Sequence, residues 1–317
     1  MAERISAASS RKRFGMEINM DAYTDFAQVY DEFMDETPYE EWCEFLAGQV
    51  KKYGIGDAAG CDDEIKNDKC VIKDRSVIKE QEKQNLRQER NTILDLGCGT
   101  GTLTELLACK GYDMIGVDNA QEMLQIAMEK RERSGLDILY LLQDMRELEL
   151  YGTVGTVVSV CDSLNYLLEE DDILQTFRLV NNYLYPQGIF IFDFNTVYKY
   201  AVVIGDATIA ENREDCSFIW ENYYHGEQEI NEYDLTIFVN GEKETGKEEE
   251  WFRRFREVHY QRGYRLEQMR ELVVRAGLDF VEALDADTHG KVTDKSERIY
   301  VVARKGAETA ANQKVKE

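Results

Sequence analysis

The residues best suited to chemistry surround a glycine-rich turn. The run ILDLGCGTGTLTELL, residues 93–107, places Asp95 before Gly97, Gly99 and Gly101. Such a turn between a strand and a helix lets the backbone approach a nucleotide-like ligand. Its G-x-G-x-G spacing differs from the G-x-G-x-x-G of dinucleotide-binding folds, and a carboxylate is poorly placed beside a pyrophosphate. The turn therefore favours a phosphate-free ligand that carries an ammonium group.

Two more acids follow the next predicted strands. Asp118 ends the run DMIGVD, where a carboxylate can accept hydrogen bonds from both ribose hydroxyls, and Asp144 lies where it could accept from an adenine amine. The carboxyl ends of parallel strands meet at one edge of a sheet, so the acids should lie together. A tight turn without any ligand is the competing interpretation of the glycines alone. A cationic adenosine compound with an amino-acid tail, S-adenosylmethionine, fits all these groups.

Candidates for acting on a second substrate are less sharply marked. Methyl transfer needs mainly a positioned nucleophile and the exclusion of water; a neutral amine needs no strong base, whereas a hydroxyl does. His259, in FREVHYQRGY, is the candidate base, with a surface histidine as the competing interpretation. The other catalytic candidates are Tyr23 and Tyr166, and further side chains near the strand ends are Asp162, Asp193, Asn195 and Trp220. Arg254, Arg256 and Arg262 could hold an anionic group or simply be solvated.

Composition restricts the class of protein. The chain has 317 residues, of which 43% are hydrophobic, enough for a sizeable core. No apolar run approaches the roughly 18 residues that span a membrane. A formal net charge of −24 disfavours nucleic acid as a partner. Seven cysteines without a C-x-x-C pair, and three histidines, argue against a metal site and for a reducing, cytoplasmic compartment.

From Asn91 the pattern alternates between strands and helices. The first five strands are predicted at 92–96, 113–117, 138–142, 156–160 and 189–194. Thr102 and Glu105 predict a capping box, Asn119 predicts an N-cap, and Pro186 marks the end of the helix before the fifth strand. This alternation predicts a doubly wound α/β sheet.

The alternation stops after the fifth strand. Residues 215–261 contain three strand-like runs, and Asn240-Gly241 indicates a hairpin with a long loop. A helix at 266–276 and strands at 278–284 and 298–304 then complete the sheet, which carries an antiparallel insertion.

The remaining segments differ in polarity from this core. The basic N-terminal segment lacks the apolar stretch of a secretory signal. We expect a disordered arm at 1–20, a helical lid at 21–54, a flexible polar insertion at 55–90, a core at 91–200 and 262–306, an antiparallel β cap at 201–261, and a polar tail at 307–317.

Several core motifs carry a family resemblance. LDLGCGTG (94–101), GVD (116–118), QDM (143–145) and VCDSLNYL (160–167) resemble the class I S-adenosylmethionine-dependent methyltransferases. The sequence is most similar to a bacterial subgroup of mostly unassigned substrate, with PYxxW near its start, and more distantly similar to amino-sugar and glycine N-methyltransferases. The resemblance implies a Rossmann-like seven-stranded sheet whose last strand is antiparallel, with the β insertion after strand five.

The resemblance also implies a cofactor site. Asp95 would hold the amino group of S-adenosylmethionine, Asp118 its ribose, and Asp144 the edge of its adenine. The other positions implied to bind the cofactor are Tyr23, Tyr30, Gly97, Cys98, Gly99, Gly101, Asn119, Met123, Met145 and Cys161.

We therefore expect a methyltransferase acting on N or O of a small-molecule acceptor. An RNA methyltransferase is an alternative, against which the acidity and the missing NPPY motif count. A non-catalytic protein that binds S-adenosylmethionine is another, disfavoured by the complete set of cofactor residues. An NAD-dependent dehydrogenase is disfavoured by the glycine spacing. No membrane partner is expected, and homodimerisation is left open.

Overall fold

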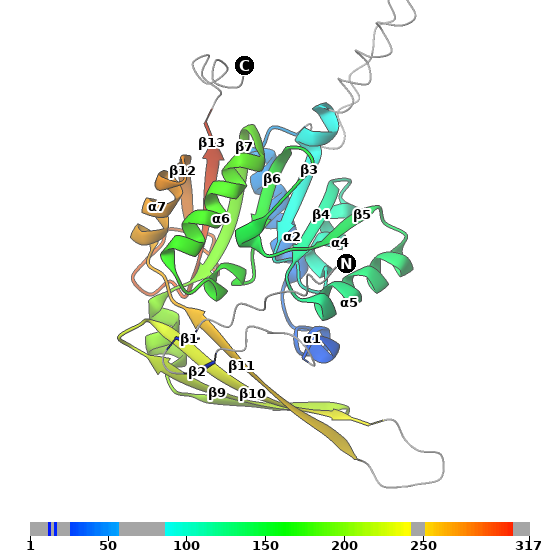
Figure 1. Cartoon of the computed structure of the whole chain (residues 1–317), viewed down its shortest axis with the longest axis vertical. Coiled ribbons are helices and arrows are strands. Elements are labelled where there is room, and N and C mark those ends of the chain that lie inside the picture. Colours follow the sequence, from blue (N-terminus) through cyan, green and yellow to red (C-terminus); the bar gives the residue numbers. More distant parts are fainter. Residues whose placement is uncertain (1–11, 14–15, 18–25, 57–85, 242–250, 307–317) are drawn as a thin grey trace, which may run out of the picture.

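The central element is a seven-stranded sheet with the strand order β12-β13-β7-β6-β3-β4-β5. The computed structural model describes residues 12–13, 16–17, 26–56, 86–241 and 251–306 (Figure 1). The parallel strands are β3 (Thr92–Leu96), β4 (Asp113–Asp118), β5 (Ile138–Leu142), β6 (Val154–Ser159) and β7 (Leu184–Asn195). The last strand, β13 (Arg298–Lys305), runs antiparallel between β7 and β12 (Leu278–Asp285). The predicted fold class is confirmed.

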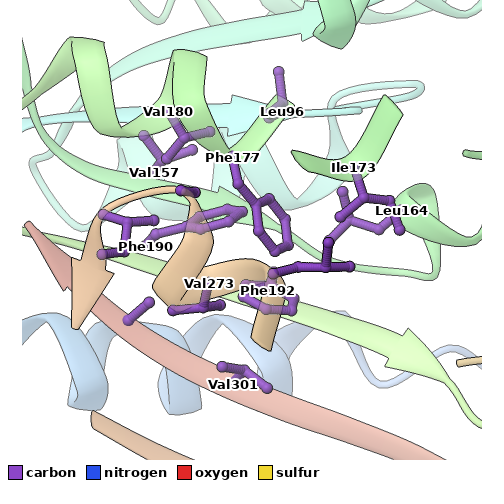
Figure 2. Packing of buried hydrophobic residues seen from close by; sticks show 14 of the residues in the cluster. Leu96, Val157, Leu164, Ile173, Phe177, Val180, Phe190, Phe192, Val273 and Val301 are labelled. Atoms are coloured by element: carbon purple, nitrogen blue, oxygen red, sulfur yellow. The ribbon is translucent and has the colours of Figure 1, made fainter. Parts of the chain in front are cut away.

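Helices cover both faces of this sheet. On one face α6 (Glu170–Tyr183) and α7 (Leu266–Arg275) pack over the phenylalanines of β7, with Phe177 against Phe190 and Phe192 (Figure 2). On the other, α2 (Tyr39–Tyr53) and α4 (Thr102–Cys109) pack over Ile189 and Ile191. β7 is apolar on both sides because it is a central strand.

Two helix starts differ from the predicted caps. α4 begins at Thr102 itself, and its N-cap is Gly101 in the left-handed conformation (φ +76°), so Thr102 and Glu105 make no capping box. α5 (Gln121–Ser134) has Ala120 as its N-cap instead of Asn119. The Asp118 carboxylate accepts a hydrogen bond from the N–H of this N-cap residue at 2.8 Å, and α5 has no side-chain cap.

The helix before the fifth parallel strand also ends earlier than predicted. α6 stops at Tyr183, and Pro186 lies inside β7. The pairing of β6 with β7 shifts register between Val154 and Thr156. This irregularity lets a proline enter the strand because Pro cannot donate to a regular ladder.

A second sheet forms the cap below the central sheet in Figure 1. Its antiparallel order is β11-β10-β9-β8, built from β8 (Thr208–Asn212), β9 (Cys216–His225), β10 (Ile230–Asn240) and β11 (Phe252–Arg262). The sequence predicted three of these strands. β8 was missed because it is a short edge strand whose side chains are mostly exposed and show no buried alternation. The π-helix η3 (Lys199–Ile204) links β7 to this cap.

The structure describes only part of the segments predicted before the core, residues 1–90. Within the arm expected to be disordered, β1 (Lys12–Arg13) pairs with β2 (Met16–Glu17). Residues 86–91, at the end of the expected polar insertion, are helical. The other residues of that arm, Tyr23, residues 57–85 and the tail at 307–317 lie outside the described residues. Among the described helices, none has the length and apolar character needed to cross a membrane.

Candidate active site

A cavity of about 430 Å³ lies at the carboxyl ends of β3, β4 and β6. Its walls come from the glycine turn, the lid helix α1 (Ala27–Phe33), the short helices η1 (Met145–Glu147) and η2 (Ser163–Tyr166), and β11 of the cap. This volume is within the range of roughly 300–1,000 Å³ found for small-molecule sites. The cavity is therefore bounded by both sheets, so core and cap together form it.

The three glycines of the turn serve different purposes. Gly97 has φ +84°, and a Cβ there would come within 2.6 Å of the Ser163 hydroxyl. Gly99 has φ +54° and lines the cavity, and a Cβ there would meet no atom within 4 Å. Gly101 lies outside the cavity lining, and a Cβ there would overlap the Tyr140 hydroxyl. Gly99 is thus the position where a side chain would enter the cavity.

Two acids, the buried Asp95 and the partly buried Asp118, lie at the cavity floor. Asp95 is 2% exposed and accepts a hydrogen bond from the Thr104 hydroxyl at 2.6 Å. Burial, together with the charge of Asp118, raises the pKa of Asp95 to about 6. Asp118 accepts hydrogen bonds from the backbone N–H groups of Gly99 and Ala120, both at 2.8 Å, and burial still raises its pKa. Both carboxylates are fixed in position and poorly solvated, as a cation site requires.

Asp144 differs from the other two acids. It lines the cavity, but the Arg146 guanidinium donates to both of its oxygens, and the Arg146 N–H donates at 2.8 Å. Burial raises the pKa of Asp144, but the hydrogen bonds from Arg146 outweigh it and leave the pKa below its usual value. Arg146 also lies 3.4 Å from Asp172. Arg146 was not predicted as a site residue, although it immediately follows QDM.

Most other predicted cofactor positions also line the cavity. Those positions are Tyr30, Cys98, Asn119, Met123, Met145 and Cys161. The Tyr30 hydroxyl lies 4.0 Å from the Cys161 sulfur, which joins the lid to the end of β6. Burial raises the pKa of the Cys161 thiol to about 12, so the thiol stays protonated. Tyr39 and Trp42 line the cavity too and were not predicted, although PYEEW contains both.

The catalytic candidates on the cap side come together. His259 is 2% exposed and lines the cavity, so it is not a surface histidine. Its Nδ1 lies 3.2 Å from the Tyr166 hydroxyl, which lies 2.7 Å from the Tyr233 hydroxyl. The Tyr233 ring stacks on the imidazole with centroids 5.0 Å apart and an interplanar angle of 9°. Tyr233 was not predicted; its partners in β9 include the predicted Trp220, 4.9 Å away between ring centroids.

Other candidates lie outside the cavity lining. Arg254 is exposed, and Arg256 pairs with Asp234 on the cap, as expected of solvated charges. Arg262 donates to the Leu168 carbonyl at 3.0 Å.

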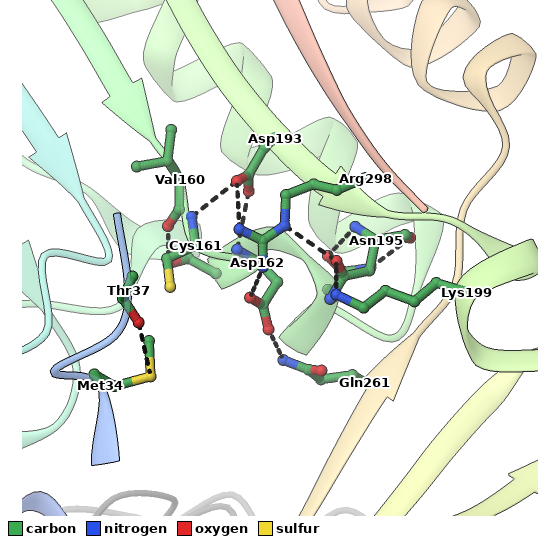
Figure 3. A network of polar contacts seen from close by, with 12 residues as sticks. Met34, Thr37, Val160, Cys161, Asp162, Asp193, Asn195, Lys199, Gln261 and Arg298 are labelled. Carbon is green, nitrogen blue, oxygen red and sulfur yellow. Dashed lines mark hydrogen bonds and ion pairs between the residues drawn. The ribbon is translucent and has the colours of Figure 1, made fainter. Parts of the chain in front are cut away.

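Three of the predicted polar residues, Asp162, Asp193 and Asn195, form a supporting network outside the cavity lining (Figure 3). Cys161 and Asp162 have φ of +62° and +55°, a strained conformation for residues other than glycine. The Asp193 carboxylate accepts hydrogen bonds from both of their backbone N–H groups, at 3.0 and 2.9 Å. Arg298 lies between the two acids and also donates to Asn195.

The same network joins core to cap. Gln261 of β11 donates to the Asp162 carboxylate at 2.6 Å (Figure 3). The cap strand that carries His259 is therefore tied to the strained loop that presents Cys161 to the cavity.

The strand order, the glycine turn and the acids at the carboxyl edge define a Rossmann-like methyltransferase architecture. Comparisons with known proteins agree. Residues 93–188 match the family model described as "Methyltransferase domain". The chain is 34% identical to "Putative methyltransferase GWCH70_2453" of Geobacillus sp. (strain WCH70), covering 89% of this chain and 99% of that relative. It is 32% identical to "Putative methyltransferase YqeM" of Bacillus subtilis (strain 168), covering 89% and 97%.

Solved structures give the same result. An S-adenosylmethionine-dependent methyltransferase from Clostridium acetobutylicum ATCC 824 superimposes with a TM-score of 0.70 at 26% identity, covering 90% of this chain and 99% of that chain. The sugar N-methyltransferase KedS8 from Streptoalloteichus sp ATCC 53650 shares the fold, with a TM-score of 0.55 at 16% identity over 79% of this chain and 100% of that one. This chain belongs to the class I S-adenosylmethionine-dependent methyltransferases.

The residues present fit the cofactor of that family. Gly99 leaves open space beside the turn, and the buried Asp95 and partly buried Asp118 supply carboxylates for a cationic group and for hydroxyls. Nothing in this floor suits a pyrophosphate, because both acids would repel it.

Proposed function

We propose that this methyltransferase acts on the nitrogen or oxygen of a small-molecule acceptor. The observation that carries this proposal is that His259 and Tyr166 line the same cavity as the glycine turn. Bound S-adenosylmethionine supplies a methyl group made electrophilic by its sulfonium. The chain must then position the acceptor, exclude water and remove a proton.

The cofactor roles follow from the floor of the cavity. In the proposal Asp95 holds the amino group and Asp118 the ribose, while the backbone at Gly99 passes beside the ligand. Asp144 accepts a hydrogen bond from the adenine amine with oxygen lone pairs that Arg146 does not occupy. Tyr30 covers the ligand from the lid, and Tyr23, outside the described residues, keeps its predicted role beside it.

The charges of the lining favour an amine as the acceptor. Glu147, Glu169 and Asp172 line the cavity. Among the described lining residues Arg146 is the one permanently charged cation, and it already contacts Asp144 and Asp172. An ammonium group would be attracted to this wall and must lose a proton before its nitrogen can attack. In the proposal, His259 and Tyr166 accept that proton, since both line the same cavity.

The test begins with binding. Calorimetry should detect S-adenosylmethionine binding to the wild-type protein and none to Gly99→Arg, whose side chain would fill the cavity. Gly135→Arg is the matched control: Gly135 also has a positive φ (+70°) and open space, but it ends α5 away from the cavity. Equal binding by both variants would overturn the proposed site.

The acceptor class is tested next. Labelled cofactor added with protein to a cell extract should transfer label to small molecules, and amines should be labelled in preference to hydroxyl compounds. Transfer to tRNA, or retention on tRNA at moderate salt, would favour the RNA alternative. Cofactor binding without transfer to any fraction would favour a non-catalytic binding protein.

A further inference from the structure

Glu257 connects the lid to the candidate base. It lies on β11 two residues before His259 and is 8% exposed. One carboxylate oxygen accepts a hydrogen bond from the Phe26 N–H, at the start of the lid helix, at 2.9 Å. The other oxygen lies 3.3 Å from His259 Nε2, an ion-pair distance without the alignment of a hydrogen bond. The Phe26 ring also meets the imidazole edge-on, with centroids 6.5 Å apart.

We propose that Glu257 is a positioning residue that sets the tautomer of His259 and docks the lid with the same carboxylate. This inference rests on the proposed function above. A neutral imidazole has one donor and one acceptor nitrogen, and the partner of one nitrogen decides the state of the other. The negative charge of the carboxylate, 3.3 Å from Nε2, favours a proton on that nitrogen even without hydrogen-bond alignment. Nδ1 is then left to accept from the Tyr166 hydroxyl.

The proton transfer then balances. The acceptor gives its proton to the Tyr166 oxygen while the Tyr166 proton moves to His259 Nδ1. With S-adenosylmethionine bound, the nitrogen or oxygen of the acceptor would form a bond to the methyl carbon as the bond between that carbon and sulfur breaks. The resulting imidazolium faces the Glu257 carboxylate, which stabilises its charge. The Tyr233 hydroxyl, 2.7 Å from that of Tyr166, can donate to the Tyr166 oxygen throughout.

The lid contact adds a second consequence. α1 contributes Tyr30 to the cavity lining, and Glu257 holds its N-cap residue, Phe26. Closing the lid and orienting the base therefore depend on one side chain. A protein with the lid released would also lose the contact between Phe26 and the imidazole, so water exclusion and base alignment would fail together.

The test uses NMR of the full-length protein labelled with ¹⁵N-histidine, without cofactor or acceptor. The chain has three histidines, so each tautomer can be assigned, and His259→Asn identifies the signals of His259. We expect Nε2–H in the wild type. In Glu257→Gln the amide oxygen can still accept from Phe26, but the NH₂ group faces Nε2, so His259 should change to the Nδ1–H tautomer. The matched control is Glu232→Gln, beside His225 at 2.8 Å on the same cap.

Cofactor binding separates the two roles. Glu257→Gln should bind S-adenosylmethionine within about threefold of wild type because the lid contact survives, whereas Glu257→Leu should bind at least tenfold more weakly. Unchanged His259 signals in Glu257→Gln, or an equal change in Glu232→Gln, would overturn the proposal. Because the tautomer is read without cofactor, these results stand apart from a failure of the wild type to bind S-adenosylmethionine, which would overturn the proposed function instead.

Discussion

At the scale of single residues, burial is what makes the strand-end acids candidates for a cation site. Asp95 and Asp118 lie at consecutive strand ends, and both have raised pKa values because burial removes water from their charges. A ligand cation would replace the missing solvation. Asp144 has already satisfied its charge with Arg146, so its pKa is lowered. Three acids at equivalent sequence positions therefore differ in their readiness to bind a cation.

This difference predicts that the ionised Asp95 carboxylate lowers the stability of the protein while it favours cofactor binding. The raised pKa means that the ligand-free protein loses stability as the pH rises through about 6, because the buried carboxyl must ionise. The loss is at most about 3 kcal/mol at pH 8 and roughly half of that at pH 5. Asp95→Asn should therefore increase the free energy of unfolding more at pH 8 than at pH 5, while weakening cofactor binding.

Chemical denaturation at the two pH values measures this effect. Asp137→Asn, an exposed acid just before β5, serves as the control and should change neither stability nor binding. A stability gain for Asp95→Asn that is equal at both pH values would contradict the assigned cause.

At the scale of elements, the short helix η2 holds the two sheets together. The Asn165 side chain donates to the Asn195 carbonyl at the end of β7 at 3.0 Å and to the Arg262 carbonyl at the end of β11 at 2.7 Å. Its own oxygen accepts from the Asn195 N–H at 2.9 Å. The asparagine of the motif CDSLNYL is thus a structural connection between core and cap.

Asn165→Ala should destabilise the protein by about 3 kcal/mol, since it leaves buried backbone groups at the ends of two strands without their partner. Denaturant unfolding measures the loss, and limited proteolysis should show earlier cleavage in the cap. Asn182→Ala, on the exposed side of α6, is the matched control and should stay within about 0.5 kcal/mol of wild type. Equal stability of the two variants would show that η2 does not carry the connection.

At the scale of the whole molecule, the larger core cluster supports the parallel sheet under the cavity. Phe177 is completely buried, with ring centroids 5.3 Å from Phe190 and 4.9 Å from Phe192 (Figure 2). These rings fill the space between α6 and β7, the strand that also carries Asp193 and Asn195 toward the site.

Phe177→Ala should lower the free energy of unfolding by about 3–5 kcal/mol, because it removes a buried ring and leaves a cavity. Tyr151→Ala removes an aromatic ring that is fully exposed and should have almost no effect. Thermal and denaturant unfolding compare the two. A loss below about 1 kcal/mol for Phe177→Ala would mean that the surrounding core collapses into the space.

The sequence by itself determined the order of the elements and the chemistry at the strand ends. Hydrophobic periodicity marks a buried parallel strand such as β7, and a turn with Asp95 and Gly99 restricts the kind of ligand, because both features are local along the chain. The helix caps were mispredicted because local side-chain patterns do not show where the backbone turns: α4 starts one residue earlier, after Gly101, and α5 one residue later, after Ala120.

Only the tertiary structure decided which residues meet. The contacts of His259 with Tyr166 and of Glu257 with Phe26 join positions that are 93 and 231 residues apart. It also separated Asp162 and Asp193, which brace a strained loop, from the acids that line the cavity. Periodicity reports which side of an element is buried, but not which distant side chain it is buried against, since that depends on how the cap sheet docks on the core.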